Sequence, residues 1–290
     1  RMAHQNYYTI LKVVRGLKTI VIVITIRSGN KNFMICLSKN LSDEYINKFA
    51  HGAGLPIYDY DNYPSDGTIL IRSMGKRKLI KESWTNNRDF YYMDSGYVGN
   101  YKSKSNPNGW KVWHRIVKND VQHNEIIDRP DDRWKRLDYP IGTRKHGNHI
   151  LLVTPSEKPC KFYGIDKDTW VSDTIAEIKK HTDRPIIVRD KAPRPQRVIK
   201  TIFDDLINCH AIVTYQSIAA IESVLFGVPA FTLAHTAADP VCDKNISLID
   251  SPTVQDKDKI YKWACHLAYG QFHNDELNNG TAYRMLKGLN

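Results

Sequence analysis

The sequence has few cysteines, lacks long apolar runs, and has fewer acidic than basic side chains. Its five cysteines include no C-x-x-C pair, which argues against a disulfide framework and against a zinc site, and indicates reduced thiols. The longest apolar run near the start, residues 20–26, is far too short to span a bilayer. We therefore expect a cytoplasmic protein with no metal and no membrane partner.

The shortage of acidic residues leaves the chain strongly basic. Its 42 Lys and Arg outnumber 31 Asp and Glu, which gives a formal charge of +11 and a sequence pI near 9.3. A basic surface attracts polyanions such as nucleic acid, acidic glycan or anionic lipid. An ordinary solvated surface explains the same composition, so charge alone does not choose among these partners.

Regular alternation of strands and helices begins near residue 149. Runs of apolar and β-branched residues predict strands at 149–153, 185–189, 211–214 and 229–233, separated by helices at 169–181, 196–209 and from 217 onward. A last helix is expected at 257–269. This order is typical of a parallel, doubly wound α/β sheet. We assign residues 147–290 to one Rossmann-like domain, the second of two along the chain.

The first half of the sequence has a weaker pattern. It predicts strands at 20–26, 33–37, 68–72, 90–94 and 110–117, with a helix that Ser42 caps and that runs to residue 53. Residues 96–109 are expected to form a loop, and residues 128–146 an irregular connector. We assign residues 1–146 to a basic α/β domain.

The most informative segment, residues 211–233, predicts a helix that starts at the carboxyl edge of the sheet. Ser217 stands at that start, and backbone N–H groups and the helix dipole there favour an anion such as phosphate. Glu222 lies about one and a half turns further on, where it can reach a sugar hydroxyl. The structural alternatives are that Ser217 only caps the helix and that Glu222 pairs with an arginine.

Other candidate side chains fall on the same edge of the predicted sheet. Arg189 and Lys191 end a strand, where cations can stabilise a departing diphosphate; the alternative is an ordinary charged loop with a salt bridge to Asp190. His235 follows the last strand and is a further candidate for donor binding. Asp94 ends the strand at 90–94 and can serve as a general base, or else form an Asx-turn.

Basic residues interleaved with aromatic ones occur in the first half. Phosphates provide affinity in a nucleic-acid groove and rings stack on exposed bases, so these clusters are candidates for such a groove. The alternative is solvated loops and core tryptophans. The candidates are Lys76, Arg77, Lys78, Arg133, Trp134, Lys135 and Arg136.

The stretch IVTYQSIAAIESVLFGVPAFTL carries an S-x-x-x-x-E-x-x-x-x-G-x-P pattern. It resembles the donor-binding half of GT-B glycosyltransferases, especially capsule-type sugar transferases, and also that of non-hydrolysing sugar-nucleotide epimerases. The resemblance implies that Ser217 contacts the diphosphate and that Glu222 binds the nucleotide ribose. The Gly-Gly pair and the Arg-x-x-Thr-Glu-Arg-Pro-Glu run of the epimerases are missing, which favours the transferases. The segments FYYMDSGYVG, WHRIVKND and TDRPIIVRDK are similar to uncharacterised phage proteins of this type.

The resemblance implies a GT-B-like fold and metal-independent transfer of a sugar from a nucleotide diphosphate sugar, which is a co-substrate rather than a cofactor. A phage setting and the basic charge point to DNA carrying a hydroxymethyl-type base as acceptor, flipped out of the duplex. One alternative is a transferase for capsular or cell-surface polysaccharide. Another is a nucleic-acid-binding protein without catalysis. The oligomeric state stays open.

Overall fold

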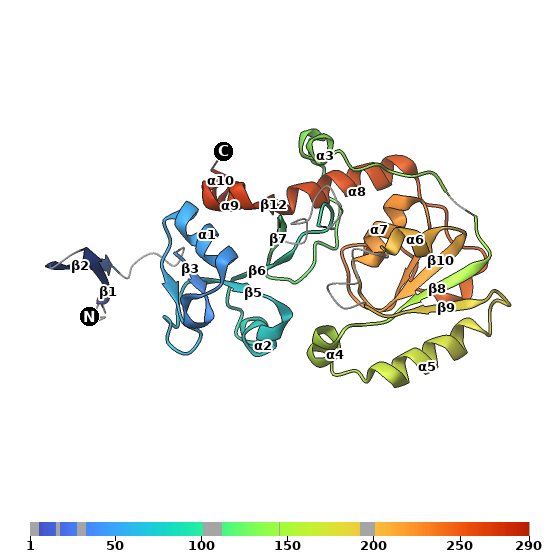
Figure 1. Ribbon diagram of the computed structural model, residues 1–290, viewed down its shortest axis with the longest axis horizontal. Helices are drawn as coiled ribbons and strands as arrows, with labels where there is room; N and C mark the ends of the chain where they lie inside the picture. The colour runs from blue at the N-terminus through green and yellow to red at the C-terminus, as the bar shows by residue number, and fades with distance from the viewer. Residues whose placement is uncertain are drawn as a thin grey trace.

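The structure, a computed structural model, describes residues 6–15, 18–27, 33–100, 112–144, 146–191 and 201–289, the first two ranges for their backbone only. Strands β1 (Asn6–Arg15) and β2 (Lys18–Arg27) pair antiparallel in a sheet of their own. The other strands form two sheets, and each sheet is the centre of one lobe (Figure 1).

The first lobe contains a six-stranded sheet in the order β12-β7-β6-β5-β3-β4. Strands β3 to β6 run parallel, whereas β7 and β12 are antiparallel to their neighbours. Apolar clusters cover both faces of this sheet. The elements are β3 (Met34–Leu37), α1 (Glu44–Ala53), β4 (Ile57–Tyr58), β5 (Thr68–Arg72), α2 (Arg77–Thr85), β6 (Phe90–Ser95), β7 (Trp113–Lys118) and β12 (Gln271–His273).

The second lobe contains a four-stranded sheet in the order β11-β10-β8-β9, in which every pair is parallel. Apolar clusters again cover both faces, so the sheet is doubly wound as predicted. Its elements are β8 (His149–Val153), α4 (Glu157–Tyr163), α5 (Lys167–Ile178), β9 (Ile186–Arg189), α6 (Ile202–Leu206), β10 (Cys209–Thr214), α7 (Ala219–Phe226) and β11 (Ala230–Thr232).

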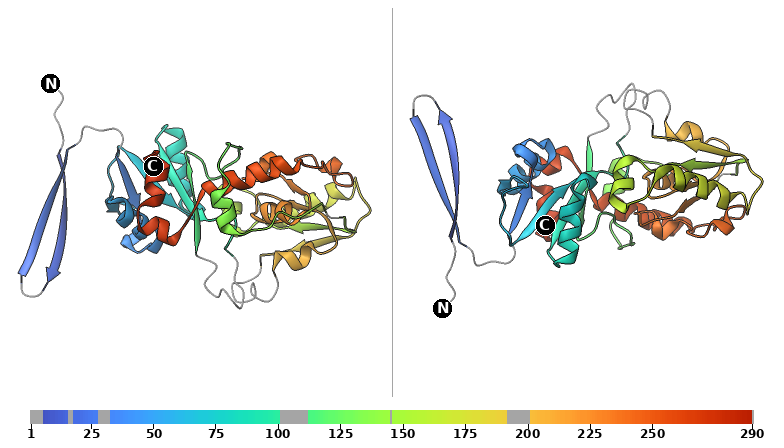
Figure 2. Two further views of the ribbon diagram at one scale, coloured as in Figure 1. Left: turned by 90° about the horizontal axis from the view of Figure 1, so that it is seen from above. Right: turned by 90° about the horizontal axis from the view of Figure 1, so that it is seen from below.

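The chain passes between the lobes twice. Helix α3 (Asp132–Leu137) lies in the connector that leads to the second lobe, and α8 (Lys257–Tyr269) runs back along that lobe toward the first (Figure 2). There β12 pairs with β7, and α9 (Asn274–Asn278) and α10 (Thr281–Lys287) pack on α1. The predicted division assigns residues 271–289 to the second domain, whereas their strand belongs to the first sheet.

Several predicted element boundaries differ from the structure for local reasons. Asp43, rather than Ser42, caps α1, because its carboxylate accepts the amides of Tyr45 and Ile46. The connector and the loop after β8 contain α3 and α4, which the sequence pattern did not predict. Of the predicted helix at 196–209, residues 196–200 lie outside the described residues. The rest is helical only over α6, and Cys209 already belongs to β10.

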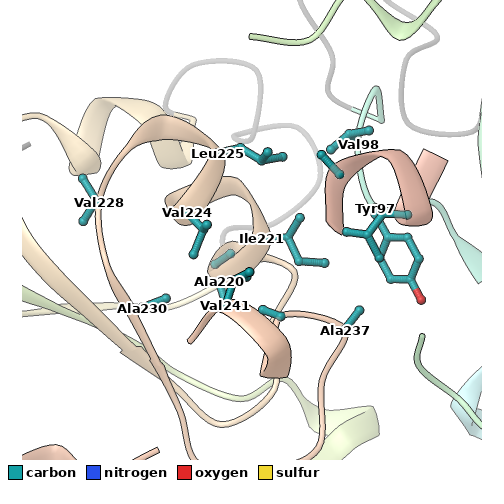
Figure 3. Close-up of a cluster of buried hydrophobic side chains, with 14 of the residues drawn as sticks. Tyr97, Val98, Ala220, Ile221, Val224, Leu225, Val228, Ala230, Ala237 and Val241 are labelled. Atoms are coloured by element: carbon teal, nitrogen blue, oxygen red, sulfur yellow. The ribbon is translucent and has the colours of Figure 1, made fainter. Parts of the chain in front are cut away.

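The lobes share an apolar core. Tyr97 and Val98, which follow β6 in the first lobe, are buried in the same cluster as Ile221 and Leu225 of α7 (Figure 3). This contact holds the start of α7 close to the first lobe. Among the described residues, no helix is long and apolar enough to cross a membrane.

Candidate functional site

The start of α7 lies after the carboxyl end of β10, as the sequence predicted. The Ser217 hydroxyl accepts the amide of Ala219 at 3.2 Å, which closes the turn before the helix. Among the described residues, the amides of Ser217 and Ile218 donate to no partner. Two amides at the positive end of a helix can bind an anion there.

Gln216 adds a buried polar group to this turn, and the sequence analysis did not select it. The residue is 8% exposed. Its side-chain amide nitrogen lies 3.6 Å from the sulfur of Met74 in the first lobe, and its Oε1 has no partner among the described residues. The signal available in the sequence was an amide side chain immediately before Ser217.

Glu222 and Arg189 form a charged cluster behind the helix start. Burial raises the pKa of Glu222 to about 7, against the opposing effect of the Arg189 guanidinium. Arg189 itself forms an ion pair with Asp205 of α6. Burial lowers the pKa of Arg189, against the opposing effects of Glu222 and Asp204. The structure therefore brings the two predicted residues together, but it directs the guanidinium toward α6 and α7.

Lys191 is exposed and is the last described residue before position 201. Its neighbour Asp190 accepts a hydrogen bond from the Thr154 hydroxyl and lies 2.6 Å from the ammonium of Lys167. Asp190 therefore has partners other than Lys191 at the end of β9. A role for Lys191 in donor binding stays a prediction.

His235 lies between carboxylates of the two lobes. Its Nε2 is 3.1 Å from both oxygens of Asp120, and its Nδ1 is 3.4 Å from Oδ2 of Asp239. The hydrogen bonds to Asp120 and Asp239 raise the pKa of His235 to about 9. Both ring nitrogens are thus engaged at neutral pH, so the imidazolium links the lobes and has no free N–H for a donor phosphate.

Asp94 is held at the end of β6. The Tyr92 hydroxyl donates to its Oδ2 at 2.5 Å, the Ser95 amide donates to its Oδ1 at 2.8 Å, and Arg115 lies 4.0 Å away. Burial raises the pKa of this carboxyl, but Arg115 and the two hydrogen bonds outweigh it, and the net pKa is lowered. The side chain is 29% exposed. An ionised, partly accessible carboxylate therefore lies near the lobe boundary.

The second basic cluster is largely structural. Arg133 is buried, where its guanidinium contacts both oxygens of Glu276 at 2.7 and 2.9 Å and the carbonyls of Ala268 and Gln271. Trp134 is 5% exposed and packs in the core. The prediction that these two residues bind nucleic acid is wrong, because neither a phosphate nor a base can reach them.

The remaining basic candidates lie at the surface with protein partners. Arg136 contacts Glu276 at 2.8 Å, and Lys135 contacts Asp131 at 2.9 Å. The Lys76 ammonium lies 3.7 Å from the centre of the Tyr60 ring, and Lys78 lies 3.7 Å from Glu82. Arg77 donates to the carbonyl of Lys161 at 3.3 Å. Whether these residues bind an acceptor stays a prediction.

Contacts between the loop after β5 and α4 place the first lobe against the site. Lys158 of α4 donates to the Ser73 hydroxyl at 3.0 Å. Ser73 has a φ of 77° and a ψ of 139°, a strained backbone for a residue with a side chain. The aromatic rings of Tyr163, at the end of α4, and Tyr215, after β10, pack edge to face with their centroids 5.5 Å apart. Among the described residues, no group of three His, Cys, Asp or Glu has the geometry to hold a metal ion.

Comparison with known proteins gives information on the fold. No protein-family model matches the sequence, and no curated protein matches it. KpsC β-Kdo 2,4-transferase of Thermosulfurimonas dismutans superposes with a TM-score of 0.54 at 10% identity, over 84% of this chain and 93% of that chain. The chain has a GT-B-like fold. A second solved structure, KpsC β-Kdo 2,7-transferase of the same organism, has a TM-score of 0.49 at 10% identity, over 89% of this chain and 99% of that one.

Proposed function

We propose that the protein is a glycosyltransferase that moves a sugar from a nucleotide diphosphate sugar to a hydroxyl acceptor. The observation that carries the proposal is the start of α7. Two backbone amides with no partner among the described residues, the Ser217 hydroxyl and the Glu222 carboxyl, whose pKa burial raises, lie there within about one and a half turns. A phosphate accepts from the amides, and the positive end of the helix stabilises the charge that develops on the leaving group.

Glu222 suits the hydroxyls of a ribose. Because its pKa is about 7, the side chain is a donor when protonated and an acceptor when ionised. Arg189 keeps the ionised form accessible at neutral pH. In this proposal Arg189 orients Glu222 and does not touch the phosphates, since its guanidinium pairs with Asp205.

Asp94 is the candidate to receive the proton of the acceptor hydroxyl. The lowered pKa of Asp94 keeps its carboxylate ionised at neutral pH, so the base is in its active form there. The same lowered pKa makes it a weak base. Transfer in this scheme forms the bond between the acceptor oxygen and the anomeric carbon and breaks the bond to the phosphate. The proton passes to Asp94, and the electron pair leaves with the nucleotide.

A glycan is the acceptor that the observations favour. The solved structure with the higher TM-score is a β-Kdo transferase, and the supposed nucleic-acid groove loses Arg133 and Trp134 to the core. The alternative that the acceptor is a hydroxymethylated DNA base is supported by the formal charge of +11 and by the surface cluster of Lys76, Arg77 and Lys78. The absence of metal dependence is part of the proposal, because the helix start supplies the positive potential.

The test is a turnover assay with separate acceptors. The protein is incubated with nucleotide sugars and either capsular oligosaccharides or hydroxymethylated DNA, and the products are weighed by mass spectrometry with and without EDTA. Glycosylated oligosaccharide in both conditions is the expected result. Glycosylated nucleosides after digestion would move the acceptor to DNA. Binding of DNA without any nucleotide binding would leave a non-catalytic nucleic-acid-binding protein and contradict the proposal.

A further inference from the structure

Two buried glutamines in this fold have opposite hydrogen-bonding environments. Gln271 of β12 is fully buried, and its Oε1 accepts the amides of Tyr97 and Val98 at 2.7 and 3.1 Å. Its side-chain nitrogen donates to the carbonyl of Val98 at 3.2 Å. Gln216 is 8% exposed, and its Oε1 has no partner among the described residues.

The environment of Gln216 is unfavourable in either orientation of its amide. Among the described residues, the polar contact of its side chain is with the thioether sulfur of Met74 at 3.6 Å, and sulfur is a weak acceptor. If the amide is turned by 180°, the oxygen faces the sulfur and the nitrogen lacks an acceptor. A buried polar group without a partner destabilises the fold, so its presence in a native structure calls for a partner that arrives later.

The position of Gln216 identifies the kind of partner. The residue lies in the turn between β10 and α7, directly before Ser217, and Met74 belongs to the opposite lobe. A group bound at the start of α7 is therefore adjacent to this amide. The Gln216 amide presents an acceptor in one orientation and a donor in the other. A hydroxyl both donates and accepts, so it can hydrogen-bond the amide in either orientation.

We infer that Gln216 is a specificity-determining residue that hydrogen-bonds a sugar hydroxyl of the nucleotide sugar, an inference that rests on the proposed function. The oxygen is shielded from solvent, so a neighbouring side chain such as that of Met74 has to move aside to admit the hydroxyl. The hydroxyl belongs either to the ribose or to the transferred sugar. A site built for a hydroxyl discriminates strongly against ligands that lack it.

The first measurement compares two variants without ligand. Gln216→Leu removes a buried oxygen that has no partner in the described part of the chain, so the Tm of this variant is expected to stay within about a degree of the wild type or to rise by about 1–3 °C. Gln271→Leu is the matched control and leaves two buried amides without an acceptor, so its Tm is expected to fall by about 5 °C or more. A fall in the Tm of Gln216→Leu as large as that of the control would overturn the inference.

The second measurement is affinity. CMP, UDP, GDP and ADP, their 2′-deoxy forms and their sugar conjugates are titrated into the wild type and into Gln216→Leu. The expected result is about tenfold weaker binding of the preferred nucleotide sugar by the variant. If Gln216 binds the ribose hydroxyl, the variant should bind the free nucleotide more weakly by the same factor, while its affinity for the 2′-deoxy nucleotide should not change. If Gln216 binds the transferred sugar, the affinity of the variant for the free nucleotide should equal that of the wild type.

The outcomes separate the two proposals. Nucleotide-sugar affinity within twofold of the wild type in Gln216→Leu would overturn the inference about Gln216 and leave the proposed function standing. Failure of the wild type to bind any member of the panel would contradict the proposed function, and the inference about Gln216 with it.

Discussion

Two arginines are held against carboxylates inside this protein, and their surroundings differ. Arg133 joins α3 to α9 through Glu276, and its guanidinium also donates to two carbonyls. Arg189 pairs with Asp205 while Glu222 and Asp204 act on the same charge. Arg133 therefore forms its ion pair with one carboxylate, Glu276, whereas three carboxylates act on the charge of Arg189.

The difference separates structure from function. The Arg133 cluster lowers the pKa of Glu276 to about 2, because the hydrogen bonds and charges outweigh burial. Around Arg189 burial dominates, and the pKa of Glu222 rises to about 7. A carboxylate that is fully paired stabilises the fold, and one left near its titration point is available to a ligand. The predictions below test this contrast.

The largest expected effect comes from breaking the satisfied pair. Arg133→Met removes the buried guanidinium and leaves Glu276 with only the half-exposed Arg136 and the His273 amide as described partners, so stability should fall by about 3–5 kcal/mol. Urea unfolding measures this loss. Arg133→Met combined with Glu276→Leu is the control, and it should recover most of the stability. A loss below about 1 kcal/mol for Arg133→Met would mean that the pair is not structural.

Acid should destabilise the protein through Glu276. Its folded pKa of about 2 lies below the ordinary glutamate pKa of 4.5, so this contribution is present above pH 4.5 and is lost as pH falls toward 2. The shift corresponds to about 3 kcal/mol. Unfolding curves from pH 5 to pH 2 measure it, and Glu276→Gln should flatten the profile there. An unchanged slope in that variant would contradict the assignment.

Glu222 should have the opposite dependence. Its folded pKa of about 7 lies above the ordinary glutamate pKa of 4.5, so its contribution to stability is present below pH 4.5 and is lost as pH rises through 7. Glu222→Gln should therefore leave stability at pH 7.5 unchanged or higher while weakening nucleotide binding by about tenfold. Denaturation and calorimetry on the same sample separate these effects. Lower stability with unaltered binding would make Glu222 structural.

The smallest expected effect is at His235. Its folded pKa of about 9 exceeds the ordinary histidine pKa of 6.5, so its contribution to stability is complete below pH 6.5 and is lost as pH rises through 9. Since the side chain is 31% exposed, we expect His235→Asn to cost about 1 kcal/mol at pH 7. The difference from the wild type should vanish at pH 10. A difference independent of pH would exclude the charged link between lobes.

Local sequence patterns predicted the strands of the second lobe well. Apolar β-branched runs gave β8 and β10 within a residue or two, because a buried parallel strand is apolar on both faces. The same pattern gave β9, although β9 is an edge strand on which Ile187 and Val188 are exposed. Short elements without a pattern were missed. Strand β12 has three residues, and only its pairing with β7 identifies it. Helix α4 contains Pro159 near its start, a residue that suits a first turn but also suits a loop.

The site was predictable only where neighbours along the chain define it. Ser217 and Glu222 belong to one helix, so their spacing was visible. The partners that decide the chemistry of the candidate residues come from elsewhere in the chain. Asp205 pairs with Arg189, Asp120 contacts His235, and Glu276 holds Arg133 in the core. Charge in the sequence does not say which carboxylate a cation will meet, and that choice separates a binding residue from a structural one.

The central claim is that a nucleotide phosphate rests on the amides at the start of α7. Hydrogen–deuterium exchange, with and without the nucleotide that binds best, observes those amides directly. The account predicts that exchange at Ser217 and Ile218 slows markedly in the bound protein, while the capped first turn of α1 is unchanged. Saturation with nucleotide and unaltered exchange at both amides would contradict it.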